Sequence, residues 1–207
     1  MKFLCSSDFH GVVPIQMKEI AKQHNINAIL AAGDFSPHGW HGEGESAEGP
    51  LRFLISLGLP VFCVHGNIDP SPDYFLHLEK MYKNFHYVHL KRVKMGDYYI
   101  VGIGDFYFMS SYVLDKFEEL LKKNPKKTIV ISHYPPLGIL DKSNLGNHAG
   151  SEELRNLIEK YQPLLFLCGH IHESAGVGNI GRTTVINAAM KNVLVEIEDE
   201  EVNVSLV

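Results

Sequence analysis

Five apolar runs along the chain each end in residues with polar side chains that commonly bind metal ions. In the printed sequence they read 3–10, 28–34, 61–67, 128–133 and 164–172. Continuous apolar stretches of this length are typical of strands buried on both faces. Ligands bind at the edge of an α/β sheet where such strands end. The pattern therefore predicts a buried sheet with a cluster of oxygen and nitrogen donors at one edge.

Helical segments alternate with these strands. Helices are predicted at 14–24, 51–57 and 110–123 and after Ser151. Pro14 suits a first helical turn, and Ser151 is a favourable N-cap because acidic residues follow it. Residues 38–50 are rich in Gly, Glu and His, so they are predicted to form a surface loop of the kind that contacts substrates.

Other segments have the pattern of hairpins. Strands are predicted at 85–93 and 98–104 around a turn at 94–97, and at 183–188, 193–197 and 202–207 as consecutive antiparallel strands with a turn at Asp199-Glu200. Strand–helix units combined with hairpins predict an α/β fold in which two packed mixed β-sheets are flanked by helices, a four-layer α/β-β/α sandwich. No repeat or linker divides the chain, so a single domain over residues 1–207 is expected.

Composition narrows the class of protein. The 207 residues include 45% hydrophobic ones, and the formal net charge is −5. That charge offers no basic footprint for long nucleic acids. No apolar stretch has the roughly 20 residues of a membrane span, and no signal peptide is recognisable, so a cytoplasmic location is expected. Cys5, Cys63 and Cys168 lie far apart in apolar runs, which indicates buried thiols.

The strand ends carry the candidate chemistry. Gly169-His170-Ile171-His172 is the strongest element, since two imidazoles follow a buried run. Asp8 and His10 would point to the same side of an extended segment. Gly33-Asp34 combines a carboxylate with a glycine that permits close backbone approach. Each element alone is also compatible with a turn or a structural histidine, but the five together indicate a metal cluster.

Taken in order, the motifs resemble the signature of the calcineurin-like metallophosphoesterase superfamily. That signature is DxH, GD, GN with a nearby acid, an isolated His, and GHxH. This chain carries Asp8/His10, Gly33/Asp34, Gly66/Asn67/Asp69, His133 and Gly169/His170/His172. The resemblance spans most of the chain. Within the superfamily, the chain resembles the small stand-alone prokaryotic members.

The resemblance implies a binuclear metal centre and the residues that hold it. One ion would be held by Asp8, His10, Asp34 and His172, and the other by Asp34, Asn67, His133 and His170. Catalytic roles are expected for Asp34, Asn67, His133 and Asp69, with a supporting or structural part as the alternative for Asp69, because it has no histidine beside it. A nitrogen and oxygen donor set without thiolates suits two divalent ions, with Mn preferred and Fe, Zn, Ni, Co or Mg as alternatives. The expected reaction is attack of a metal-bridging hydroxide on a small nucleotide-like or other phosphate ester, more specifically a diester.

The chain departs from the family pattern at one position. Many members have a histidine directly after the GN pair, where it is implied to protonate the leaving group, but this chain has Ile68. Because positioned acid catalysis contributes roughly 10²–10⁴-fold, its absence favours substrates with good leaving groups. His38, His41 and His148 are candidate substitutes or substrate contacts, with a solvated loop position as the alternative for each.

Two other segments are open to two interpretations. Residues 144–151 contain glycines before a helix start and could offer backbone N–H groups to a phosphate, or be an ordinary connection. Trp40 could stack on a base or pack beneath its loop.

The alternative function is a weakly active or inactive protein-binding scaffold with the same fold, which the substitution at Ile68 favours and the intact ligand set opposes. A nuclease is disfavoured by the acidic balance, and a protein phosphatase by the lack of sequence beyond the core. The expected partner is therefore a small phosphate ester, with no membrane or long nucleic acid. The pattern leaves the oligomeric state open.

Overall fold

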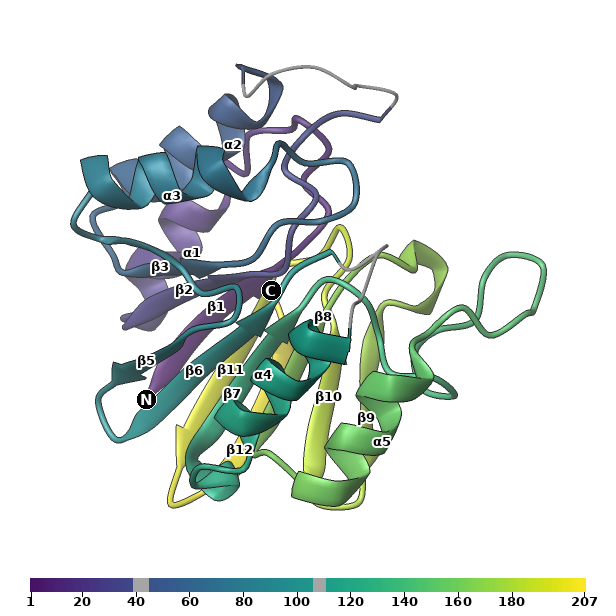
Figure 1. The fold of residues 1–207 in the computed structure, drawn as a ribbon. Coiled ribbons are helices and arrows are strands. Elements are labelled where there is room, and N and C mark those ends of the chain that lie inside the picture. Colours follow the sequence, from purple (N-terminus) through teal and green to yellow (C-terminus); the bar gives the residue numbers. More distant parts are fainter. Residues whose placement is uncertain (39–44, 106–110) are drawn as a thin grey trace.

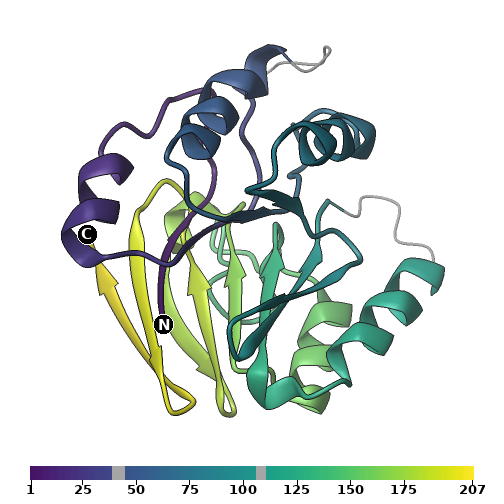
Figure 2. The ribbon, with the colours of Figure 1, turned by 90° about the vertical axis from the view of Figure 1, so that its left-hand side faces the viewer.

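Two six-stranded β-sheets pack face to face in the computed structural model, which describes residues 1–38, 45–105 and 111–207. Helices cover the outer face of each sheet, and the two layers of strands lie between them (Figures 1 and 2). The predicted α/β four-layer arrangement is therefore confirmed. Because most central strands are covered on both faces, they consist of nearly continuous apolar residues.

The first sheet has the strand order β12-β11-β1-β2-β3-β4. Its strands are β1 (Lys2–Ser6), β2 (Ala28–Ala31), β3 (Val61–Cys63), β4 (Phe85–Tyr87), β11 (Val193–Glu198) and β12 (Glu201–Leu206). Strands β1 to β4 are parallel, whereas β11 pairs antiparallel with both β1 and β12.

The second sheet has the order β5-β6-β7-β8-β10-β9. Its strands are β5 (Arg92–Met95), β6 (Tyr98–Ile103), β7 (Thr128–Ser132), β8 (Leu165–Cys168), β9 (Gly176–Ile180) and β10 (Thr183–Asn187). The four inner strands are parallel, and antiparallel β5 and β9 form the edges.

The helices divide between the two outer faces. They are α1 (Met17–His24), α2 (Glu45–Ser56), α3 (Pro72–Met81), α4 (Ser111–Leu121) and α5 (Glu152–Tyr161), with short 3₁₀ turns at Pro125–Lys127 and His172–Ser174. Helices α1 to α3 cover the first sheet, and α4 and α5 cover the second (Figure 1). The predicted N-cap is present, since Ser151 Oγ accepts a hydrogen bond from Leu154 N at 3.1 Å.

Alternation along each strand builds three apolar layers. In β1, Phe3 and Cys5 face the layer between the two sheets, while Leu4 faces the helices. In β7, Ile129 and Ile131 face the same central layer, and Val130 faces α4 and α5. The three cysteines are free and buried, as predicted. The central layer fixes one sheet against the other, so residues at the ends of both sheets hold fixed relative positions.

Several element predictions were wrong in detail. Residues 85–93 form two short strands, β4 and β5, which belong to different sheets. Strands β10 and β11 also lie in different sheets, so the chain crosses between the sheets at 188–192. Local alternation reports burial but not the identity of the partner strand, and for this reason the sequence left both crossings undetected.

Helix boundaries differed as well. Helix α2 begins at Glu45 with Pro50 inside it, so the predicted loop 38–50 is partly helical. Helix α1 begins at Met17 rather than Pro14. Helix α3 was missed, although Pro72 at its first turn and Phe75 and Leu78 on one face are a recognisable signal. Residues 39–44, including His41 and Trp40, lie outside the described residues.

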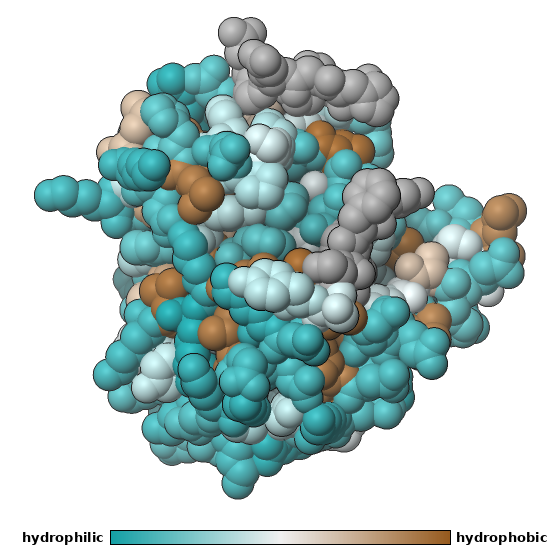
Figure 3. All heavy atoms as spheres, viewed as in Figure 1, coloured by the Kyte–Doolittle hydropathy of each residue, from teal (hydrophilic) through white to brown (hydrophobic). Residues whose placement is uncertain are grey.

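The molecular surface is mainly polar on the face shown in Figure 3, where apolar side chains form small separate patches. Isolated apolar patches of this kind are normal on protein surfaces. Among the helices of the described residues, none is both long and apolar enough to cross a bilayer.

Candidate metal centre

Two loops that leave neighbouring strands run side by side and carry the first polar residues of the site. The loop after β1 and the loop after β2 continue the pairing of their strands through three main-chain hydrogen bonds. These bonds are Asp8 N to Gly33 O at 3.0 Å, His10 N to Asp34 O at 3.0 Å, and Gly11 N to Phe35 O at 2.8 Å. The loops are therefore fixed to each other along their length.

The backbone at the site is not extended. Asp8, His10, Asp34 and His170 have φ values of 58°, 46°, 54° and 70°. The expectation that Asp8 and His10 share one side of a strand was therefore wrong in its reason, because β1 ends at Ser6. Left-handed residues bend the chain sharply after β1, β2 and β8 and so change the direction of the side chains there. Such strain is common at functional sites.

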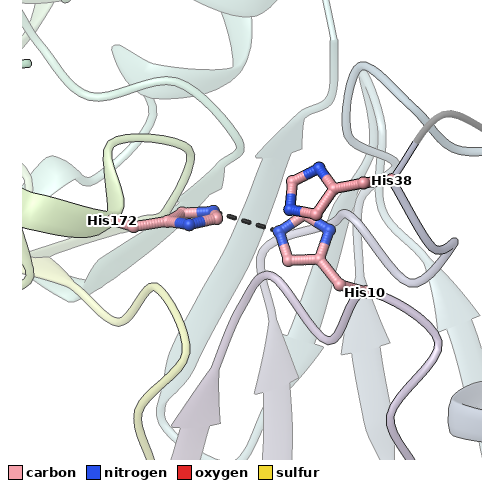
Figure 4. Close-up of side chains that lie close together, drawn as sticks. All are labelled: His10, His38 and His172. Carbon is pink, nitrogen blue, oxygen red and sulfur yellow. Dashed lines mark hydrogen bonds between the residues drawn. The ribbon is translucent and has the colours of Figure 1, made fainter.

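Asp8, His10 and His172 form the first cluster. His172 Nε2 lies 3.1 Å from Asp8 Oδ1 and 3.0 Å from His10 Nε2, and His10 Nε2 lies 3.8 Å from Asp8 Oδ1. Figure 4 shows the rings of His10 and His172 facing each other from different sheets. These separations are those of donor atoms around one ion with bonds of about 2.0–2.2 Å.

Asp34, Asn67 and His133 form the second cluster, which adjoins the first. His133 Nε2 lies 2.9 Å from Asn67 Oδ1 and 3.4 Å from Asp34 Oδ1. One donor atom each of Asp8, Asp34 and His133 falls within 4.8 Å of the others, and all three residues are buried. The carboxylate of Asp34 thus lies between the two clusters.

His170 points away from its neighbour in the GHxH motif. Its ring lies 5.1 Å from that of His133 and 4.2 Å from that of Tyr134, centre to centre. His172, by contrast, begins a 3₁₀ turn and faces the first cluster. The prediction of strand spacing for this pair was wrong, because β8 ends at Cys168 and the two rings diverge toward different clusters.

At two motif positions glycine is required because a larger residue would clash with its neighbours, and not because the backbone has a positive φ. A Cβ on Gly66 would lie 2.0 Å from Asp34 Oδ1, and a Cβ on Gly169 would lie 2.1 Å from Asp8 Oδ2 and Ser7 Oγ. Both distances are far inside van der Waals contact. The glycines of the GN and GHxH motifs therefore leave room for the two carboxylates at the centre of the site.

Asp69 holds the loops in position. Its Oδ1 accepts hydrogen bonds from Phe35 N at 2.7 Å and Ser36 N at 2.9 Å, and its Oδ2 accepts one from Gly66 N at 2.8 Å. Both carboxylate oxygens are thus committed to main-chain N–H groups. This geometry supports a positioning role for Asp69, which is the alternative that the sequence left open beside a catalytic one.

The orientation of His133 depends on a group that sequence reasoning missed. Its Nδ1 donates to the carbonyl of Ala32 at 2.8 Å when the proton lies on that nitrogen, which leaves Nε2 free to bind at the site. A backbone carbonyl leaves no side-chain signal in the sequence, so only the fold could identify it. Tyr134, whose ring lies beside that of His170, was also missed as a residue near the site. Its position directly after His133 is the signal that could have identified it.

Buried charges at the centre strongly perturb one another. Burial raises the pKa of Asp34 to about 7, with the carboxylates of Asp69 and Asp8 adding to the effect and His133 opposing it. For Asp8, burial is outweighed by the hydrogen bond from His172 and the charge of His133, which lower the pKa to about 2. Burial opposes protonation of His133, but Asp34 and Asp8 raise its pKa. Asp8 and Asp34 thus both interact with the positive charge of His133, and a second positive charge at the site would stabilise both carboxylates.

The pKa values of His10 and His170 are both lowered, which favours the neutral imidazole. Burial lowers the pKa of His10 to about 4, with His38 and His172 contributing, and burial with the charge of His133 lowers the pKa of His170 to about 4. Neutral imidazoles are the form that binds metals.

The donor set fits divalent cations. Buried carboxylates, an amide oxygen and imidazoles converge within ligand distance. The Nε2 atoms of His10 and His172 face each other at 3.0 Å, and both cannot present lone pairs there without a proton or cation between them. The thiols take no part, because Cys5, Cys63 and Cys168 are buried inside strands and desolvation raises the pKa of each.

The three candidate substrate contacts have different positions. His38 stacks on His10, with ring centres 3.7 Å apart. His148 lies in the loop before α5, where its Nδ1 is 2.6 Å from Asp141 Oδ1. His41 is outside the described residues. The structure thus brings His38 to the site, and it pairs His148 with a buried aspartate.

Comparison with known proteins agrees with this architecture. The family model for calcineurin-like phosphoesterases matches residues 1–174. The human metallophosphoesterase domain-containing protein 1 is 31% identical over 91% of this chain and 66% of its own length. The protein MJ1162 of Methanocaldococcus jannaschii is 28% identical over 94% of this chain and 91% of its own.

Solved structures share the fold at low sequence identity. The crystal structure of TT1561 of Thermus thermophilus has a TM-score of 0.73 at 19% identity, covering 99% of this chain and 98% of that one. A novel archaeal phosphodiesterase has a TM-score of 0.62 at 14% identity, covering both chains completely. The matched family model spans every strand end at the site, and the chain therefore belongs to the calcineurin-like phosphoesterase family, a class of metal-dependent phosphoric ester hydrolases.

Proposed function

We propose that this protein is a binuclear-metal phosphodiesterase acting on a small nucleotide-like or other phosphate ester. One ion would be held by Asp8, His10, Asp34 and His172, and the other by Asp34, Asn67, His133 and His170. Manganese is the preferred metal of this proposal. When bound, the two ions supply Lewis acidity that polarises a phosphoryl group and lowers the pKa of water.

One observation carries the proposal. Oxygen and nitrogen donors from both sheets meet at Asp34, whose Oδ1 is 3.4 Å from His133 Nε2 and whose neighbour Asp8 contacts His172 at 3.1 Å. An acidic group between two separate donor clusters is the arrangement that a bridging ligand requires. The three cysteines are buried, so they are poorly placed to act as a covalent nucleophile, which is consistent with attack by water.

The chain's own residues prepare the site. The carbonyl of Ala32 fixes the ring of His133 through Nδ1, and Asn67 Oδ1 lies 2.9 Å from Nε2, so both donor atoms face the same point of the site. Asp8 accepts the backbone N–H of His170 at 3.0 Å, which fixes the GHxH loop over the first cluster. Such contacts keep ligating side chains in place before a substrate arrives.

The leaving group receives no help from the position after Asn67. Ile68 uses its backbone N–H to donate to Asp34 Oδ1 at 3.3 Å, and its side chain cannot transfer a proton. We therefore expect a preference for esters with acidic leaving groups, which depart without a proton. This expectation supports activated diesters as first substrates.

The test uses metal-stripped protein reloaded with Mn²⁺. Bis-p-nitrophenyl phosphate and p-nitrophenyl phosphate report diester and monoester hydrolysis, and Asp34→Asn and His133→Ala serve as site variants. Metal-dependent diester turnover that both variants lose supports the proposal. Turnover only of the monoester would contradict diester specificity.

The same experiment addresses the scaffold alternative. Two ions bound per chain without turnover on either ester, with any of the candidate metals, would indicate a protein that keeps the site for binding. Activity that survives in both variants would instead contradict the proposed ligand set.

A further inference from the structure

A cavity of about 170 Å³ adjoins the first donor cluster and shares one residue with it. Asp8, whose Oδ1 lies 3.1 Å from His172 Nε2, also lines this cavity. Residues 6–8, at the end of β1, contribute to its lining, and residues 190–192 contribute from the crossing between β10 and β11. The cavity therefore lies beside the proposed metal centre, although most of its lining belongs to none of the family motifs.

A tight turn after β1 connects the cavity to the donor cluster. Val12 N donates to Phe9 O at 2.8 Å, and the two central residues, His10 and Gly11, have φ values of 46° and 76°. Positive φ at both central positions is the pattern of a type I′ turn. His10 reaches the first cluster, where its Nε2 lies 3.0 Å from that of His172, and Val12 ends the turn at the cavity. The position of one cavity wall is thus tied to that of a donor residue.

Contacts with the end of β1 fix a second wall of the cavity. Met190 N donates to Ser7 O at 3.0 Å, and Ser6 Oγ donates to Lys191 O at 2.8 Å. In Figure 2, the yellow segment that leads into β11 lies beside the purple loop that follows β1. Met190 has a φ of 56°, in a region that bulky residues seldom adopt. Local strain of this kind is common at binding sites, where the surrounding contacts maintain it.

Exposed apolar side chains gather around the cavity. Val12 is 68% exposed and Met190 is 62% exposed, and both line it. Ile15, in the same loop as Val12, is 65% exposed. Phe9 and Pro14 are buried and add apolar surface to the lining. Single exposed apolar residues are ordinary, whereas several around one hollow mark a binding site.

Two side-chain amides add hydrogen-bonding groups to the apolar walls. Gln16 and Asn192 line the cavity, and within the described part of the chain neither amide makes a hydrogen bond. Each amide offers two N–H donors and one acceptor oxygen, which are the groups that pair with the edge of a nucleobase. Lys191 adds a positive charge to the lining, and that charge favours an anionic ester.

The volume of the cavity limits the size of its occupant. An apolar cavity of about 150 Å³ accommodates benzene, so a cavity of about 170 Å³ suits one ring system and not a whole nucleotide. The phosphate of such a ligand would remain outside the cavity. Because Asp8 belongs to both sites, the phosphate would then lie on the side of the donor cluster.

We propose that this cavity binds the base of a nucleotide ester whose phosphate lies at the metal centre. The inference rests on the proposed function and narrows its substrate class from phosphate esters in general to nucleotide esters. Val12 and Met190 contact the faces of the base, and Gln16 and Asn192 contact its edge. These side chains determine specificity, because they bind a part of the substrate that does not react.

The test compares two diesters that differ only in the base. One is the p-nitrophenyl ester of thymidine monophosphate, and the other is its abasic analogue, in which a hydrogen atom replaces the base. Mn²⁺-loaded wild type, Met190→Ala and Gln16→Ala are assayed with both. The side chain of Gln16 makes no capping hydrogen bond to α1, so its loss leaves the helix intact. Met81→Ala is the matched control, because Met81 is 56% exposed on α3 and does not line the cavity.

We expect the wild-type KM for the ester with the base to be about 10-fold or more below that for the abasic ester, since one apolar group in a hydrophobic pocket contributes roughly this much. Met190→Ala and Gln16→Ala should each reduce this ratio by about 3-fold or more, through KM rather than kcat. Met81→Ala should keep the wild-type ratio, and circular dichroism checks that each variant is folded. Equal KM values for the two esters, or cavity variants that keep the ratio of Met81→Ala, would overturn the inference.

Failure of this inference is distinguishable from failure of the proposed function. Hydrolysis of both esters with equal KM leaves the phosphodiesterase proposal in place and overturns only the base site. If wild type hydrolyses neither ester, the proposed function fails, and calorimetric titration of the Mn²⁺-loaded protein with thymidine monophosphate tests the cavity by itself. Binding that Met190→Ala weakens and that the abasic phosphate lacks supports the base site, and absence of binding overturns it as well.

Discussion

His133 and Asn67 meet at 2.9 Å, Nε2 to Oδ1, although they follow strands of different sheets. His133 comes after β7 and Asn67 after β3. Their contact crosses the seam where the two sheets pack, so the second donor cluster exists only when both sheets are assembled. Loss of this contact should therefore affect metal binding more than folding.

Replacing Asn67 with Ala should lower kcat/KM and weaken binding of one of two Mn²⁺ ions, by about 10-fold or more. The reason is that the amide oxygen is lost as a ligand, which leaves the Nε2 of His133 with one donor fewer beside it. Isothermal titration with Mn²⁺ measures the effect. Asn67→Asp is the control, since it keeps an oxygen donor and should retain the second ion. Equal affinities in Asn67→Ala and wild type would remove Asn67 from the ligand set.

Replacing Gly169 with Ala should disrupt the first cluster. The new Cβ would lie 2.1 Å from both Asp8 Oδ2 and Ser7 Oγ, so Asp8 must move away from His172. We expect loss of one bound ion per chain, measured by elemental analysis after dialysis against metal. Gly58→Ala is a control without a steric clash, because a Cβ there has nothing within 4 Å, although its φ of 74° carries some backbone strain. Retention of two ions in Gly169→Ala would show that the loop relaxes without cost to the site.

Replacing Asp69 with Ala should destabilise the protein by about 3 kcal/mol or more, because three backbone N–H groups lose their acceptor and each buried orphan donor costs about 1–3 kcal/mol. Asp69→Asn keeps one acceptor oxygen and should lose less. Urea unfolding of metal-free protein measures both. A loss of activity with full stability in Asp69→Ala would argue for a direct catalytic role.

The pair of Asp141 and His148 should make stability depend on acid pH. Burial opposes ionisation of Asp141, but His148 and the N–H groups of Gly138 and Gly150 outweigh it and lower the pKa. A lowered folded-state pKa contributes stability that is fully present above the unfolded value of about 3.9 and is lost as pH falls through the folded value. Urea unfolding of wild type between pH 5 and pH 2 should show this loss, and Asp141→Asn should show less of it. Parallel pH profiles for the two proteins would contradict the assignment.

Metal removal should lower thermal stability, because ions that bind only the folded chain stabilise it by about 2.7 kcal/mol at 100 times their Kd. The melting temperature with EDTA, and then with Mn²⁺ restored, measures this. Asp34→Asn should respond little to either treatment. A chelator-insensitive wild type would argue against tight binding at the site.

Much of this fold could be predicted from local pattern. Buried strands such as β7 and β8 are recognisable as apolar runs, and the N-cap at Ser151 follows from one hydroxyl before acidic residues. Sheet membership could not be predicted, because Val193 pairs with Cys5 in one sheet and Thr183 with Ile180 in the other, and burial of a strand does not identify its partner. The crossing at 188–192 is decided by packing.

The sequence by itself determined which residues carry the chemistry, since donor side chains and small glycines stand in a fixed order at the ends of apolar runs. Only the tertiary structure decided how they group. Left-handed turns at Asp8 and His170 aim side chains across the seam between the sheets, which separates His170 from His172, while the loop after β2 brings His38 onto His10. The physical reason is that a strand's alternation of side chains ends where the backbone leaves the extended conformation, and beyond that point direction is set by contacts between segments distant in the chain.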